Sequence, residues 1–152
     1  MNPARYDLGL VACTRAKNPT GINARTLYRG GTFSLIMRHA MQRCDRVMIM
    51  SGKYGLLNMD DPIRYYDTFV NTLTAEERAA LIERCRVQLQ PLRGLRVLSY
   101  LWIPYYSLLL EADATIAAGF HRPYNGLPTM PATLQKTLTR EVTNYGTHPS
   151  RR

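Results

Sequence analysis

Polar and reactive side chains gather in two short segments of this sequence, each directly after an apolar run. The apolar runs cover residues 6–13 and 46–50. The first segment contributes Cys13, at the end of its run, and then Thr14, Arg15 and Lys17. The second contributes Ser51, Gly52, Lys53, Tyr54 and Gly55, with Tyr65, Tyr66 and Asp67 further along.

The two lysines of these segments are candidates for phosphate binding or for nucleophilic catalysis. A lysine that has cationic neighbours, or that is partly removed from water, holds its proton less tightly. Lys17 and Lys53 therefore suit either role, although a lysine alone is most often a solvated surface charge.

Asp67 and Cys13 are the other candidates for chemistry. Asp67 is a candidate general base, or a carboxylate that stabilises positive charge on a sugar ring while a glycosidic bond breaks. It can equally cap a turn. Cys13 is a candidate nucleophile, or a small buried hydrophobic side chain at the end of a strand.

The histidines and cysteines do not have the spacing of a metal site. His39 and His148 have no second ligand at metal-binding spacing, and three cysteines far apart favour neither disulfides nor structural zinc. We predict no metal and no cofactor.

His121 and Tyr124, in a loop near the end of the chain, are candidates to reach the same site as the two segments. The full set of candidate ligand-binding residues is Thr14, Arg15, Ser51, Gly52, Tyr54, Gly55, Tyr66, His121 and Tyr124.

Apolar periodicity and capping signals predict strands that alternate with helices. We predict strands at 6–13, 46–50, 95–103 and 115–118, and helices at 32–44, 75–89, from Pro104 and at 132–142. Before the helix at 75–89, Thr74 and Glu77 form a capping box. The stretch 56–73 mixes turn residues with aromatics and is predicted to be an ordered loop that folds over a site.

This alternation favours an α/β fold: a three-layer sandwich with a mostly parallel sheet of four to five strands and helices on both faces. With 152 residues, 45% of them hydrophobic, the chain suits one domain over 1–152, in which 144–152 is a loose tail. In open parallel sheets, ligands bind beyond the carboxyl ends of the strands. If the first two strands are neighbours, the two polar segments share one crevice there.

The chain is strongly basic, with 20 Lys and Arg against 11 Asp and Glu and a net charge of +9. This balance favours nucleic acid or nucleotides as partners, although a solvated basic surface has the same composition. No apolar run has the roughly 18 residues of a membrane span, and the N-terminus lacks a secretory signal. We therefore expect a cytoplasmic protein without a membrane partner. The oligomeric state does not follow from the sequence.

The two segments together resemble the signature of a family of small uncharacterised bacterial and phage proteins. The signature reads Cys13-x-x-x-Lys17, then Ser51-x-Lys53-Tyr54-Gly55-Leu56-Leu57, then Ile63 and Tyr66-Asp67, and the match extends through the helix after Thr74. That family is similar in turn to the catalytic core domain of archaeosine synthase, which has a Cys-x-x-x-Lys motif, and more distantly to YaaA-like peroxide-stress proteins. Both relatives deal with nucleic acid, so the resemblance implies base or nucleotide chemistry, or DNA binding.

Three functions are open on this basis. The first is an enzyme that cleaves an N-glycosidic bond, or transfers or modifies a base, in nucleic acid or in a nucleotide. Its candidate catalytic residues are Cys13, Lys17, Lys53 and Asp67, and Tyr54, Tyr66 and Tyr124 offer stacking faces for a base. The second is a non-catalytic DNA- or RNA-binding protein, in which arginines neutralise phosphates. The third is an enzyme for free nucleotides or nucleosides.

Overall fold

A four-stranded sheet forms the centre of the structure, a computed structural model that describes residues 5–14, 17–123 and 136. The strands are β1 (Tyr6–Ala12), β2 (Cys44–Ser51), β3 (Gly55–Asn58) and β4 (Val97–Ser99). Their order across the sheet is β3-β2-β1-β4. β1 pairs in parallel with β2 and with β4, and β3 pairs antiparallel to β2. The predicted α/β fold with a mostly parallel sheet is confirmed.

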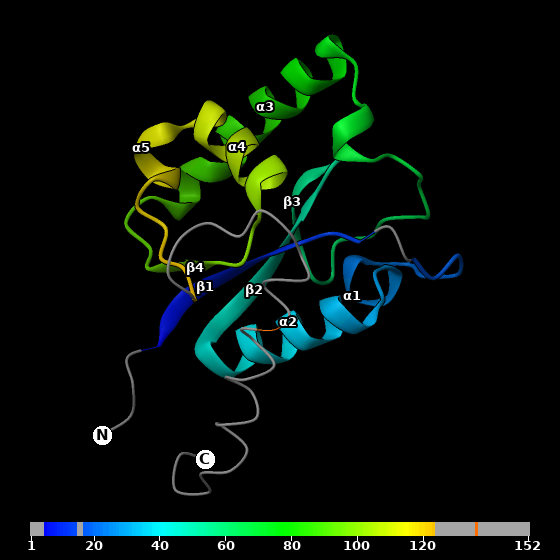
Figure 1. Cartoon of the computed structure of the whole chain (residues 1–152), viewed down its shortest axis with the longest axis horizontal. Helices are drawn as coiled ribbons and strands as arrows, with labels where there is room; N and C mark the ends of the chain where they lie inside the picture. The colour runs from blue at the N-terminus through cyan, green and yellow to red at the C-terminus, as the bar shows by residue number, and fades with distance from the viewer. Residues whose placement is uncertain (1–4, 15–16, 124–135, 137–152) are drawn as a thin grey trace, which may run out of the picture.

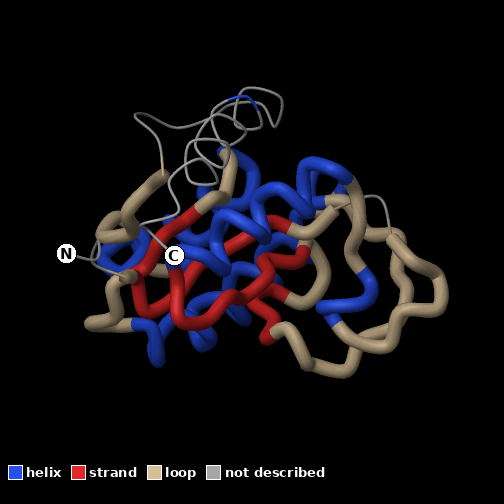
Figure 2. Tube along the Cα trace, turned by 90° about the horizontal axis from the view of Figure 1, so that it is seen from below, coloured by secondary structure: helices blue, strands red, loops and turns tan. Residues whose placement is uncertain are grey.

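Helices cover both faces of this sheet, which gives three layers (Figure 1). One face carries α1 (Ala24–Leu27) and α2 (Gly31–Arg43), and the other carries α3 (Ala75–Leu89), α4 (Ile103–Ala112) and α5 (Ala114–Ala117). Two 3-10 turns, η1 (Val70–Thr72) and η2 (Gln90–Leu92), flank α3. In the second view the helices again enclose the strands (Figure 2). No helix in the described part of the chain is long and apolar enough to cross a membrane.

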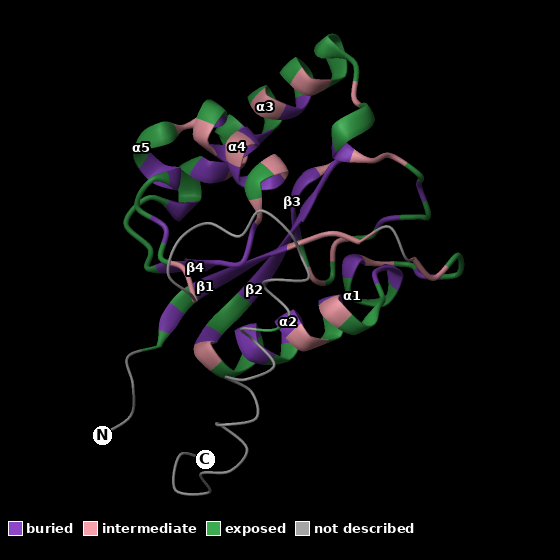
Figure 3. Cartoon of the chain, viewed as in Figure 1, coloured by how far each residue is buried: buried purple, intermediate pink, exposed green. Residues whose placement is uncertain are grey.

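The central strands send alternate side chains into two cores. Leu10 of β1 and Met50 of β2 belong to the core under α3 and α4, whereas Val11 and Ile49 belong to the core over α2. Successive strand residues point to opposite faces, so a strand covered on both sides reads as one continuous apolar run. This explains the uniform apolar character of 46–50. The central strands are accordingly buried along most of their length (Figure 3).

The capping box predicted before α3 is present, and the helix has the predicted bounds. The Glu77 amide donates to the Thr74 hydroxyl at 3.1 Å, and the Thr74 amide donates to the Glu77 carboxylate at 2.9 Å. The capping contacts hold the pKa of the Glu77 carboxyl below its usual value. The helix at 31–43 agrees with the predicted 32–44 within one residue at each end, and the helix at 103–112 begins one residue before the predicted start at Pro104.

Three local predictions were wrong. The strand predicted at 95–103 is shorter, because β4 covers only Val97–Ser99 and Ile103 already begins α4. The stretch predicted as a loop from residue 56 begins with most of β3, because the chain turns back after Ser51 and its next residues pair with β2. The predicted strand 115–118 is helical, because the Asp113 carboxylate accepts the Ile116 amide at 3.1 Å and so starts α5. The short helix α1 was not predicted. The predicted last helix, 132–142, lies outside the described residues apart from residue 136.

Candidate functional site

The loops that follow β1 and β2 meet at one edge of the sheet, as the sequence predicts. The two strands are neighbours, with Ala12 opposite Met50, and the Cys13 amide continues the pairing by donating to the Met50 carbonyl at 2.9 Å. Figure 1 shows the loops after β1 and after β3 at the same end of the sheet. Residues far apart in the chain therefore come together there.

Three hydroxyl groups form a buried chain at this edge. The Ser51 oxygen accepts hydrogen bonds from the amides of Lys53 and Tyr54, both at 3.1 Å, and these occupy its two lone pairs. Its own proton then goes to the Tyr66 oxygen at 2.6 Å. Tyr66 in turn lies 2.5 Å from the Tyr28 hydroxyl, to which it donates. The chain thus has a direction, from Ser51 through Tyr66 to Tyr28.

Burial keeps both phenols of this chain protonated. It raises the pKa of Tyr28 to about 12, and it raises the pKa of Tyr66 further, with the neighbouring Cys13 and Tyr28 adding to the increase. A phenol with a raised pKa stays neutral at physiological pH. Tyr66 and Tyr28 therefore act as hydrogen-bonding groups that hold neighbouring side chains in place.

Two lysine ammonium groups lie near the ring of Tyr66. Lys17 Nζ is 4.8 Å from the centre of that ring, and Lys53 Nζ is 5.7 Å from it and 5.3 Å from the centre of the Tyr54 ring. Tyr54 and Tyr66 meet edge to face, with ring centres 5.3 Å apart. Among the described residues, neither lysine has a carboxylate within ion-pairing distance. We call this group of four residues, Lys17, Lys53, Tyr54 and Tyr66, the lysine–tyrosine cluster.

Cys13 lies beside the same edge and contacts α4. Its sulfur is 3.4 Å from the Tyr105 hydroxyl, and the thiol is half-buried. Burial raises the pKa of Tyr105, and the adjacent Cys13 adds to that increase. The third parallel strand, β4, thus contributes to the site through the helix that follows it.

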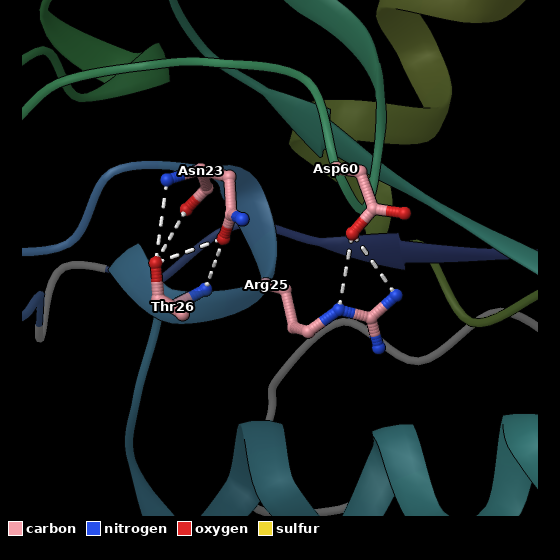
Figure 4. A network of polar contacts seen from close by, with 4 residues as sticks. All are labelled: Asn23, Arg25, Thr26 and Asp60. Carbon is pink, nitrogen blue, oxygen red and sulfur yellow. Dashed lines mark hydrogen bonds and ion pairs between the residues drawn. The ribbon is translucent and has the colours of Figure 1, made fainter.

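The segment between Lys17 and Tyr28 forms one wall of the site, and several contacts hold it against the turn after β3. Asn23 and Thr26 close a capping box around α1, and the Arg25 guanidinium pairs with the Asp60 carboxylate at 3.3 Å (Figure 4). The Arg25 amide also donates to the Met59 carbonyl at 2.8 Å. A groove of ≈ 660 Å³ runs beside this wall, lined by residues 19–22, Tyr54 and residues 62–65.

A glycine and a glutamine support the turn that carries Lys53. Gly55 has a φ of +74°, which favours glycine, and a Cβ there would collide with the amide oxygen of Gln88. That oxygen accepts the Leu56 amide at 2.8 Å, while the Gln88 nitrogen donates to the carbonyls of Tyr54 and Leu56. The Gln88 side chain on α3 thus forms the hydrogen bonds of the backbone groups at the outer edge of β3 and holds the turn in place. Gly52 is buried, and a Cβ there would lie 3.2 Å from the Val70 amide nitrogen.

The outcomes for the other predicted residues differ. Asp67 is exposed, and among the described residues its carboxylate has no hydrogen bond or ion pair. Thr14 is half-buried next to Cys13. Arg15 and Tyr124 lie outside the described residues.

The expectation that His121 reaches the site is wrong. Its amide donates to the Val97 carbonyl at 2.8 Å, and its ring lies edge-on against Tyr6, with ring centres 5.4 Å apart. Tyr6 begins β1, whereas Cys13 follows the end of that strand. His121 therefore lies beside the middle of β4, opposite Leu98, and its ring contacts the first residue of β1 and not the end that carries Cys13.

Sequence reasoning missed Tyr28 and Tyr105. Tyr105 had a usable signal, because it lies in the helix directly after a parallel strand and so near a carboxyl end. Tyr28 had none, since its place in the site depends on how the segment 17–28 folds back. Among the described residues, no group of three or more His, Cys, Asp or Glu side chains is arranged to hold a metal ion.

The fold and the site define an open-sheet α/β domain with a lysine–tyrosine cluster beyond its parallel strands. The chain belongs to a family of unknown function, DUF6884, whose profile matches residues 8–135. No curated protein and no solved structure matches the chain at a significant level.

Proposed function

We propose that this protein is an enzyme that acts on a nucleobase or nucleotide, by cleaving or exchanging an N-glycosidic bond. The observation that carries the proposal is the placement of two ammonium groups, those of Lys17 and Lys53, around the single ring of Tyr66. Cations without carboxylate partners at this edge favour an anionic ligand group. A phosphate, bound by both lysines, fits that description.

The groove beside the cluster suits the flat part of such a ligand. Tyr54 belongs to both the cluster and the groove, and the groove also presents Ile22 and Tyr65, which are 72% and 52% exposed. Aromatic faces stack on nucleobases of any sequence. A ligand with a phosphate near the lysines and a planar ring near Tyr54 is a nucleotide.

Hydrolysis at such a site needs few groups from the protein. Water adds to the sugar carbon, the bond from that carbon to the base nitrogen breaks, and the base takes the bonding electrons and a proton. Positive charge develops on the sugar, and a carboxylate stabilises it. Asp67 is our candidate for this role, because one peptide bond joins it to Tyr66. Cys13, whose sulfur lies 3.4 Å from the Tyr105 hydroxyl beside the same edge, is the candidate nucleophile if the base is exchanged through a covalent intermediate.

A non-catalytic nucleic-acid-binding protein is the second candidate function. The observation in its favour is the Asp67 side chain, which is exposed and has no hydrogen bond among the described residues to orient it. Catalytic groups are usually held in position by their neighbours. If the protein only binds, Asp67→Asn changes nothing beyond the local charge.

Thermal unfolding with nucleotides tests ligand binding. Adenosine monophosphate is compared with adenosine for the native chain, Lys17→Gln, Lys53→Gln and a control, Lys136→Gln, which removes an exposed lysine outside the cluster. A ligand that binds the native state raises the melting temperature. We expect the monophosphate to raise it more than adenosine does, and each cluster variant to bind about tenfold more weakly, as for a lost charged hydrogen bond. A native chain whose melting temperature responds to no nucleotide would overturn the proposal.

Release of free base, followed by chromatography of the reaction mixture, separates the enzyme from the binding protein. Nucleotides and short oligonucleotides with each of the common bases serve as substrates. The enzyme releases or exchanges a base, and Asp67→Asn slows this by two or more orders of magnitude, as for a lost catalytic carboxylate. Binding without release, equal in Asp67→Asn and the native chain, would support the second candidate.

A further inference from the structure

A second hollow lies along α2 and borders Tyr28. One section, of ≈ 610 Å³, runs from Tyr28 along α2, and another, of ≈ 430 Å³, continues to the start of β2. The sections share Arg25, Met37, Met41 and Met59, so they form one continuous groove. We call it the arginine groove.

Basic side chains dominate this groove. Its lining contains five arginines and two carboxylates, and the carboxylates are already paired: Asp45 with Arg5 at 2.8 Å, and Asp60 with Arg25 at 3.3 Å. Among the described residues, the other three arginines of the groove have no carboxylate partner. These three are Arg29, Arg38 and Arg46, all exposed.

The spread of these charges indicates a polymer and not a single phosphate. The 13 residues of α2 extend over about 20 Å, at about 1.5 Å per residue, which is the axial length of about six nucleotides in one strand. Arg29 precedes α2, Arg38 lies within it, and Arg46 follows it. One phosphate cannot contact all three, whereas successive phosphates of a strand can.

The arginine groove and the candidate site border the same side chain, that of Tyr28. Tyr28 lines the groove, and its hydroxyl is the last of the chain that begins at Ser51. A strand lying along α2 therefore passes the residue that borders the lysine–tyrosine cluster.

We propose that the substrate is a nucleotide within a single strand of nucleic acid, whose backbone lies in the arginine groove. The phosphates neighbouring the target nucleotide bind Arg29, Arg38 and Arg46, while Lys17 and Lys53 hold the phosphate of the target itself. This inference rests on the proposed function, because it names the substrate class of that same site.

An acidic amphipathic peptide is the competing occupant. Met41 is 57% exposed in the groove, and flexible methionines line many surfaces that bind apolar peptide side chains. The charge favours nucleic acid, because the successive phosphates of a strand match three arginines that are spaced along the groove and have no carboxylate partner among the described residues.

Fluorescence anisotropy with a labelled ten-nucleotide single strand, at several salt concentrations, tests the proposal. The test variant is Arg29→Gln with Arg38→Gln. The control variant is Arg86→Gln with Arg93→Gln, which removes the same charge from exposed positions in the α3 layer. The plot of log K against log salt has a negative slope. Loss of two phosphate contacts should make it less steep by about 1.4, at about 0.7 for each contact. The control should keep the native slope, and the binding of adenosine monophosphate should be the same in both variants.

Three outcomes would overturn the inference. In the first, the test variant binds the strand as the native chain does. In the second, the test and control variants lose the same affinity, which means that only net charge matters. In the third, a glutamate- and leucine-rich peptide binds with the same arginine dependence while the strand does not bind. The proposed function fails separately, if Lys17→Gln and Lys53→Gln leave adenosine monophosphate binding unchanged.

Discussion

The hydroxyl oxygen of Ser51, at the end of β2, lies 2.6 Å from that of Tyr66, which belongs to the loop after β3. Ser51 also accepts the amides of Lys53 and Tyr54, so one side chain joins the lysine-bearing turn to the loop. The ammonium groups of two different segments then both lie near the ring of Tyr66. The position of the lysines therefore depends on a hydroxyl group that is fully buried.

Substitutions of Tyr66 separate its two roles. Tyr66→Phe removes the hydroxyl but keeps the ring near Lys17, so we expect it to reduce the free energy of unfolding by about 1–3 kcal/mol, as for a buried partner left unsatisfied. Nucleotide affinity should change less than threefold. Tyr66→Leu also removes the ring, and affinity should fall further, by about threefold to tenfold, because the cations lose an attraction of about 0.5–1 kcal/mol or more and their fixed position.

Urea unfolding and titration calorimetry with adenosine monophosphate measure these two effects. Tyr65→Phe, which removes an exposed hydroxyl from the next residue, is the matched control for stability. Equal nucleotide affinity in Tyr66→Phe and Tyr66→Leu would show that the ring does not position the lysines.

Stability should decrease at alkaline pH, in part because of Tyr28. Its pKa is raised from 10.0 to about 12 in the folded chain. Below pH 10 Tyr28 is protonated in both the folded and the unfolded chain, and its contribution to the free energy of unfolding is complete. Between pH 10 and 12 only the unfolded chain loses the proton, so the free energy of unfolding falls by about 1.4 kcal/mol for each pH unit. Cys44 and Cys85, whose pKa values burial raises to about 11 and about 12, steepen this decline.

Tyr28→Phe removes one of these groups, so its stability should fall less steeply above pH 10 than that of the native chain. Urea unfolding at pH 8 and at intervals up to pH 11 gives both slopes. The variant starts from lower stability at pH 8, because Tyr66 loses its acceptor. Parallel curves for the two proteins above pH 10 would contradict the burial of Tyr28.

Gly55 and Gly94 form a matched pair of glycines with positive φ, at +74° and +84°. Alanine at Gly94 meets open space, so we expect only the backbone cost, about 1–2 kcal/mol. Alanine at Gly55 also displaces the Gln88 amide from three hydrogen bonds, which adds about 0.5–1.5 kcal/mol for each bond. Denaturant unfolding of both variants measures the difference.

A double variant tests the cause. In a background of Gln88→Ala, the collision with the glutamine is absent and only a close contact with the Cys85 sulfur at 3.3 Å remains, so Gly55→Ala should cost only slightly more than Gly94→Ala. If Gly55→Ala costs the same with and without Gln88, the glutamine does not hold this turn.

Local chemistry let the sequence determine the main elements and their order. The capping box at Thr74 marks the start of α3, and the apolar runs mark β1 and β2, because these signals come from residues near one another in the chain. The rule that loops meet at the carboxyl ends of parallel strands then brought Cys13, Lys17, Ser51 and Lys53 to one edge. The sequence could not show that residues 56–58 form a strand, since pairing with β2 decides this. The cap at Asp113 before α5 is a local signal, which the prediction of a strand at 115–118 overlooked.

Only the tertiary structure decided which side chains complete the site. Tyr28 and Tyr105 enter it because the segment after β1 folds back and because α4 follows the third parallel strand. His121 lies outside it because its backbone pairs with Leu98 in β4 and its ring packs against Tyr6 at the start of β1. Each of these contacts joins residues distant in the chain. The packing of the layers determines such contacts, and no local pattern of residues encodes them.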